Sequence, residues 1–128
     1  LGTDGWDDNK VIDIAGKDAL NNTFYSTHYS DQDKDVQGFI ELFKKENDGK
    51  EPNVFAALGY DAGKMLIEAI KQAKSTDPQK IRDALENLKN VQVGTGVISI
   101  DKDHNPIKPA VILELKDGSK VMKEKIFR

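Results

Sequence analysis

The most constraining feature of this sequence is an unbroken block of helical periodicity in the middle of the chain. From Asp33 to about Asn47, apolar residues recur at the i, i+3, i+4 and i+7 spacing of one helical face: Val36, Phe39, Ile40 and Phe43. A second helical pattern fills residues 54–75, and a third begins with Pro78 at its first position. Because no strand separates these helices, a regular alternation of strands and helices is not expected.

The second helix is predicted to carry both an apolar stripe and a set of small residues. The stripe is expected to comprise Ala62, Leu66, Ala69, Ile70 and Ala73. The small residues lie in the first turns: Ala56, Ala57, Gly59, Ala62 and Gly63. They would let this end of the helix approach another backbone closely.

Extended segments flank the helical block. A short helix is predicted for residues 7–15, ended by Gly16, and FYSTHY at 24–29 favours a strand or an extended crossing segment. After Asn90 the apolar period changes to two, in VGTGVISID and in PAVILELKDGSKVMKEKIF, where Asp-Gly predicts a hairpin turn. The fold class is therefore α/β, with central helices and a strand-rich C-terminal end.

Length and composition exclude several classes of protein. A chain of 128 residues with 38% hydrophobic content can bury one modest core. The net charge of -3 is scattered without a basic block, so nucleic acid is not an expected partner. No apolar run approaches the roughly 20 residues of a membrane span, and no leader pattern follows Leu1, so any targeting segment is removed or outside this sequence. The absence of cysteine excludes disulfides and thiolate metal sites.

The stretch DQDKDVQGFIELF raises the question of a calcium loop, because Asp31, Asp33 and Asp35 alternate. Such a loop needs glycine at position 6 and glutamate at position 12. These positions hold Val36 and Leu42, so both geometric requirements fail. The better interpretation is the solvated entrance to a helix, in which Asp31 or Asp33 is the cap and Asp35 favours the positive end of the dipole.

No other motif predicts a metal site or an enzyme. DKDHNP at 101–106 has Pro106 where a calcium loop needs glycine, so a turn between strands is favoured. His28 and His104 have no local partners for zinc binding or catalysis. The sequence contains no phosphate-binding glycine loop, no GxSxG and no HExxH. We therefore expect no metal, no cofactor and no catalytic residue.

The most pointed chemical feature is GTDGWDD at the start of the chain. Asp4, between Gly2 and Gly5, follows an apparent strand, which suits the carboxyl edge of an open sheet where α/β proteins bind ligands. An aspartate there can bind an ammonium group, and the indole of Trp6 can line a pocket. The alternative is that Asp4 caps a helix and Trp6 belongs to the core.

A series of motifs resembles a known family. In order, they are GTDGWDD, FYSTHYSDQDKDVQGFIELFKKENDGKEPNVFAALGYDAGKMLIEAI, TDPQKIRDALENLKNVQVGTGVISIDKDHNPIKP and VILELKDGSK. Together they are similar to the C-terminal portion of type I periplasmic solute-binding proteins, above all the branched-chain amino-acid (Leu/Ile/Val) binding proteins of ABC importers. The resemblance covers essentially this whole chain but only part of the family's chain.

The resemblance implies a fragment of a two-lobed fold. Residues 1–24 would belong to the second lobe, and 25–94 to the first lobe after a crossing near 25–31. Residues 95–128 would form the return crossing, near 95–101, and further strands of the second lobe. Asp4 matches the acid that binds the α-ammonium of the ligand, usually Glu in this family and here one methylene shorter, while Trp6 and Tyr60 match positions that line the cleft.

The resemblance also implies a function and partners. The intact protein would capture an amino acid between its lobes and deliver it to the ABC permease, outside the cytoplasm, as a periplasmic or lipid-anchored extracellular protein. The isolated chain would bind ligand poorly, would need the missing N-terminal part, and would self-associate through uncovered apolar faces such as that of residues 36–43. The competing interpretation is a freestanding receiver-like signalling or protein-interaction module.

Overall fold

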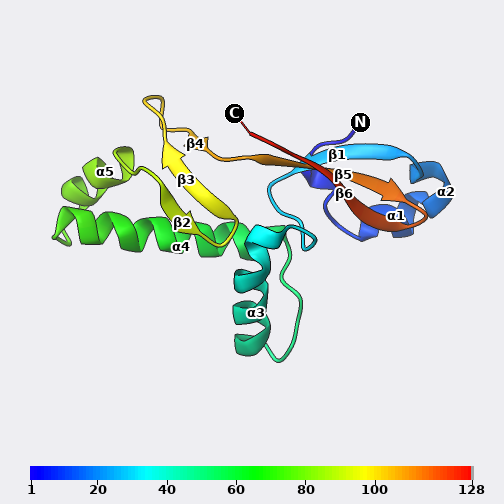
Figure 1. Ribbon diagram of the computed structural model, residues 1–128, viewed down its shortest axis with the longest axis horizontal. Coiled ribbons are helices and arrows are strands. Elements are labelled where there is room, and N and C mark those ends of the chain that lie inside the picture. The colour runs from blue at the N-terminus through cyan, green and yellow to red at the C-terminus, as the bar shows by residue number, and fades with distance from the viewer. Residues whose placement is uncertain (128) are drawn as a thin grey trace.

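The computed structural model describes residues 1–127, which form two units joined by two short crossings (Figure 1). The sheet unit contains a 3-10 helix η1 (Asp4–Trp6), α1 (Lys10–Ala15), α2 (Lys17–Leu20), β1 (Thr23–Thr27), β5 (Ala110–Lys116) and β6 (Ser119–Ile126). The helical unit contains η2 (Lys34–Val36), α3 (Gln37–Glu46), α4 (Val54–Ala73), α5 (Pro78–Glu86), β2 (Val91–Val93), β3 (Gly96–Ile100) and β4 (Pro106–Ile107). We call residues 28–33 the first crossing and residues 108–109 the second crossing.

The sheet unit is an antiparallel sheet with strand order β1-β5-β6, covered by α1 and α2. The predicted hairpin joins β5 to β6, with positive φ at both Asp117 (51°) and Gly118 (79°), as a tight reversal requires. Gly2 extends the sheet through a parallel bridge to Tyr25. Its buried core comprises Leu20, Tyr25, Val111, Leu113 and Leu115.

The helical unit confirms the predicted face of α3. Val36, Phe39 and Ile40 are buried, and Phe43 is partly buried against them. They pack against Tyr29 and the start of α4, so this face is covered within the chain. The expectation that it would lie uncovered is therefore wrong. A second core lies where α4 and α5 meet the antiparallel β2-β3-β4 sheet (Figure 1).

The predicted stripe of α4 is only partly correct: Ala69 is buried and Ile70 and Ala73 are half-buried, but Ala62 and Leu66 are exposed. The buried positions are Val54, Ala57, Asp61 and Ala69. Leu66 and Ile67 are exposed, as is Phe55, and a Cβ at Gly59 or Gly63 would meet no atom within 4 Å. The reason is that α4 is apolar around most of its circumference, so the helical period alone does not choose the covered side.

Boundaries elsewhere differ by a few residues. The helix predicted for residues 7–15 begins only at Lys10, as α1, and Gly16 ends it as predicted, at φ 80°. Residues 96–100, within the range expected for the return crossing, form β3, and the second crossing lies between β4 and β5. The assignment of these segments to lobes stays a prediction. No helix within residues 1–127 has the length and apolar composition of a membrane span.

Candidate functional site

Asp4 and Trp6 lie together in η1, which begins two residues after Gly2, the residue that bridges to β1. The carboxylate of Asp4 is exposed, and its Oδ2 lies 3.7 Å from Nε2 of His28. Trp6 is half-buried against the core of the sheet unit, and its indole lies so close to Gly2 that a Cβ there would collide with it. Asp4 thus presents an exposed carboxylate beside His28, whereas Trp6 serves the packing of its own unit.

Tyr60 lies in the other unit, on α4. Its ring is 5.0 Å from that of Phe39, centroid to centroid. A Cβ at Gly94 would lie 2.9 Å from Cδ1 of Tyr60, so this glycine permits a close approach. The structure therefore brings Asp4 and Trp6 together in the sheet unit and places Tyr60 in the helical unit.

Asp7 holds the loop after η1 in place, a role that the sequence did not indicate. Its carboxylate accepts hydrogen bonds from Thr27 Oγ1 (2.8 Å) and Tyr25 Oη (3.2 Å). It also forms an ion pair with Lys120 Nζ at 2.6 Å. Burial, and then the charge of Asp7, raise the pKa of Tyr25 far above its usual value. The hydroxyl thus remains a donor, and the loop is tied to β1 and β6.

A surface hollow of about 650 Å³ lies between the two units. Its walls come from residues 7–9, from the first crossing and from the segment before α4. Tyr29 lines it, with a buried hydroxyl that has no hydrogen-bond partner among the described residues. Burial raises the pKa of Tyr29 to about 12, with smaller contributions from Asp31, Glu51 and Asp7. These carboxylates give the hollow a negative potential, which favours groups such as ammonium over anions.

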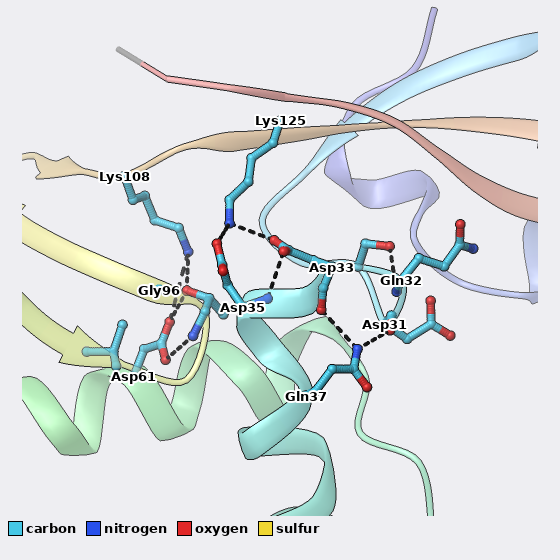
Figure 2. Close-up of polar contacts among 12 residues, drawn as sticks. Asp31, Gln32, Asp33, Asp35, Gln37, Asp61, Gly96, Lys108 and Lys125 are labelled. Atoms are coloured by element: carbon cyan, nitrogen blue, oxygen red, sulfur yellow. Dashed lines mark hydrogen bonds and ion pairs between the residues drawn. The ribbon is translucent and has the colours of Figure 1, made fainter.

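The most deeply buried carboxylate of the helical unit belongs to Asp61, next to Tyr60. It accepts hydrogen bonds from the backbone N–H groups of Gly94 (2.7 Å) and Thr95 (3.2 Å) and from the Thr95 hydroxyl (2.5 Å). Lys108 reaches the same place from the second crossing, 3.0 Å from Thr95 Oγ1 and 4.0 Å from Asp61 (Figure 2). In the sequence, the one hint of this cluster is Asp61 itself, a charged residue among the small and apolar residues of α4.

The acidic stretch 31–35 differs from its prediction in one respect. Asp33 does cap the following helix, accepting from the Asp35 N–H at 3.0 Å. Asp33 itself is buried rather than solvated, although Asp31 and Asp35 are exposed, and both Asp33 and Asp35 bind Lys125 of β6 (Figure 2). The turn at 101–106 forms as predicted, with Asp101 accepting from the N–H groups of Asp103 and Asn105. Within residues 1–127 no three His, Asp or Glu side chains gather as metal ligands would.

Known proteins match this chain over nearly its whole length. Residues 1–120 match the family model described as Periplasmic binding protein. The Leu/Ile/Val-binding protein homolog 1 of Brucella suis is 30% identical over 113 residues, which cover 86% of this chain. That match spans only 29% of the Brucella protein, so the relatives are much longer than the chain.

Solved structures agree with the sequence matches. The leucine-binding protein LivK of Thermotoga maritima superposes with a TM-score of 0.83 at 34% identity, over 98% of this chain and 36% of its own. LivJ of Streptococcus pneumoniae, solved in complex with isoleucine, gives a TM-score of 0.82 at 25% identity, over 99% and 36%. The predicted α/β fold class is confirmed. The chain belongs to the periplasmic binding protein family and forms part of its type I fold.

Proposed function

We propose that this chain is part of the substrate-binding protein of an ABC importer, which captures a branched-chain amino acid between two lobes and delivers it to the membrane permease. The observation that supports this most is the match to a leucine-binding protein over 98% of the chain at 34% identity. The family consists of solute-binding proteins rather than enzymes. The parent protein would work in the periplasm or outside the cell, free or lipid-anchored.

Each unit would belong to a different lobe of the parent. The sheet unit would be part of the second lobe, the helical unit would be part of the first, and the two crossings would link the lobes. Two features support this assignment: the units have separate cores, and the hollow lined by Tyr29 and Asp31 lies between them. Motion of one unit against the other would open and close that hollow.

Asp4 would bind the α-ammonium of the amino acid, and Trp6 and Tyr60 would line the cleft from opposite lobes. In the intact parent, Asp4→Ala should weaken leucine binding about 10- to 100-fold, the usual effect of losing a charge-assisted hydrogen bond. Titration calorimetry would measure this. Asp13→Ala, which removes an exposed carboxylate from α1, is the matched control and should leave the affinity unchanged. Equal affinities for the Asp4 variant and the native protein would refute the role of Asp4.

The isolated chain should not bind amino acids measurably. The family resemblance places the groups that hold the ligand carboxylate in the N-terminal half of the first lobe, outside this sequence. Half of the polar contacts of the ligand would therefore be missing. Calorimetry with leucine, isoleucine, valine and alanine would test this, and micromolar binding to the isolated chain would overturn it.

The outward face of α4 supports a requirement for the missing N-terminal part. Phe55, Leu66 and Ile67 are exposed on a helix whose glycines are open, and the matched relatives are about three times longer than this chain. In isolation this face should drive self-association. Sedimentation should show dimers or larger species that Leu66→Glu converts to monomers. A compact native monomer at high concentration would count against this.

A receiver-like signalling module is not supported as the alternative. Such a domain has a parallel sheet with helices between successive strands. Here both sheets are antiparallel, and α3, α4 and α5 follow one another directly. The match to the family model over residues 1–120 is independent of this topology and agrees with it.

A further inference from the structure

The first crossing is tied to the edge strand of the sheet unit by a side-chain amide. Gln32 donates from Nε2 to the carbonyl of Lys120 (2.7 Å), and its Oε1 accepts from the N–H of Met122 (2.9 Å). These two bonds reproduce the hydrogen bonds that the backbone of a neighbouring strand would form with the free edge of β6. The crossing therefore leaves the sheet unit in a fixed position.

Lys125, farther along the same strand, reaches across to the start of the helical unit. Its Nζ lies 2.7 Å from Asp33 Oδ2 and 2.6 Å from Asp35 Oδ2 (Figure 2). Only 13% of the Lys125 side chain is exposed. One ammonium group thus binds two carboxylates on the entrance to α3, and it joins the two units directly.

The two carboxylates are not equivalent. Asp33 is 9% exposed and is fixed further by capping η2 with its other oxygen, Oδ1. Asp35 is 64% exposed, and no further bond fixes its carboxylate among the described contacts. Asp33 is therefore the fixed partner, and Asp35 is the partner that can be released into water at little cost.

Among residues 1–127, no comparable side-chain tie joins the second crossing to the sheet unit. Lys108 turns back into the helical unit, where it bonds to Thr95 beside Asp61 (Figure 2). Pro109 then leads directly into β5. The angle between the units is thus left to the contacts of the first crossing.

We propose that Lys125 is a positioning residue that sets the angle between the two units, with Asp33 as its fixed partner and Asp35 as its releasable one. When both carboxylates are bound, η2 at the entrance to α3 is held near β6. When Asp35 is released, the long lysine side chain acts as a pivot on Asp33, and the units can change their angle. This inference goes beyond ligand capture and holds whether or not the parent binds an amino acid.

The absence of cysteine from the chain allows a direct measurement of this angle. Asp18→Cys in α2 and Lys80→Cys in α5 place one spin label on an exposed position of each unit. Pulsed electron paramagnetic resonance then gives the distribution of distances between them. Excess unlabelled protein removes distances between molecules. No ligand is added, so the result is separate from any failure of the proposed function.

With native Lys125 the distribution should be narrow. Lys125→Met should make it about twice as broad, as expected when a hinge loses its restraint. Lys125→Arg should restore the narrow distribution, because a guanidinium group can bind both carboxylates. Lys123→Met is the matched control. Lys123 lies on the same strand as Lys125, but its ion pair with Glu114 of β5 stays within the sheet unit, so its loss should leave the distance distribution unchanged.

Asp35→Asn keeps the proposal testable if Lys125→Met fails to fold. This exposed substitution should give an intermediate width, since Asp33 still holds the ammonium group. Circular dichroism and thermal unfolding would establish that each variant is folded. A native width in folded Lys125→Met, or in Asp35→Asn, would overturn the proposal, as would equal broadening by Lys123→Met.

Discussion

Lys108 of the second crossing and Lys125 of β6 are buried to a similar extent but have different partners. The exposed fraction of the side chain is 10% for Lys108 and 13% for Lys125. Lys108 has one carboxylate at 4.0 Å, that of the buried Asp61, whereas Lys125 has two within 2.7 Å, one of them exposed. The contact between Lys108 and Asp61 does not involve the sheet unit, whereas the contacts of Lys125 join both units.

The difference teaches that the bonding partners of a lysine, and not its burial alone, decide whether its pKa is raised or lowered. Burial lowers the pKa of Lys108, and the charge of Asp61 opposes this only in part. Burial also lowers the pKa of Lys125, but hydrogen bonds to Asp33 and Asp35, together with their charges, outweigh it and the pKa is raised. The Lys108 cluster is therefore built for packing within one unit, and the Lys125 contact for holding two units together.

The largest effect should come from removing the buried carboxylate. Asp61→Ala leaves the N–H groups of Gly94 and Thr95 and the ammonium of Lys108 buried without their acceptor. We expect a loss of about 3–5 kcal/mol in the free energy of unfolding, typical of breaking a buried pair from one side. Urea unfolding at constant protein concentration would measure it.

The exposed carboxylate of the other cluster is the matched control. Asp35→Ala should cost less than about 1 kcal/mol, because an exposed ion pair contributes little and Asp33 remains bound to Lys125. If the Asp35 and Asp61 variants were equally destabilised, the distinction between a packing cluster and a joining contact would be wrong.

Close packing next to Asp61 gives the second prediction. A Cβ at Gly94 would lie 2.9 Å from Tyr60 and 3.1 Å from both Phe39 and the carboxylate of Asp61. Gly94→Ala should therefore destabilise the chain by about 1–3 kcal/mol, the usual effect of overpacking. Urea unfolding provides the measurement, and the side chain of Tyr60 should report the disturbance by NMR.

Gly63→Ala is the control for this substitution. A Cβ at Gly63 meets no atom within 4 Å on the outward face of α4, and alanine favours the helix by up to about 1 kcal/mol. The two glycine variants should thus change stability in opposite directions. A neutral Gly94 variant would show that the Asp61 cluster is loosely packed.

Local patterns predicted the elements of this fold well, because they depend on neighbours in sequence. The buried face of α3, the Asp-Gly hairpin and the stop at Gly16 follow from spacing and backbone preference. The covered side of α4 did not follow, since apolar residues occupy most of its circumference. Packing selects that side: α3 and Tyr29 cover the start of α4, and α5 and β2 cover its later turns.

The site was less predictable because its contacts join distant parts of the chain. Lys125 and Asp35 are 90 residues apart, so no local pattern connects them. The alternating aspartates were recognised as a helix entrance, but their lysine could not be identified. Asp4 and Trp6 came from the GTDGWDD motif and the family resemblance, and Tyr60 from the resemblance alone; their roles in ligand binding stay predictions.

The smallest effect, and the sharpest test of the comparison, is the pH dependence of the two lysines. Each unfolded lysine titrates near 10.5. The stabilisation due to Lys125, measured against Lys125→Met, should be constant below pH 10.5 and lost above it, because its folded pKa is raised. For Lys108 the folded pKa is lowered, so the native protein should gain stability relative to Lys108→Met as the pH rises towards 10.5. Urea unfolding from pH 7 to 11 would measure both differences, and slopes of the same sign would contradict the opposite roles assigned to these lysines.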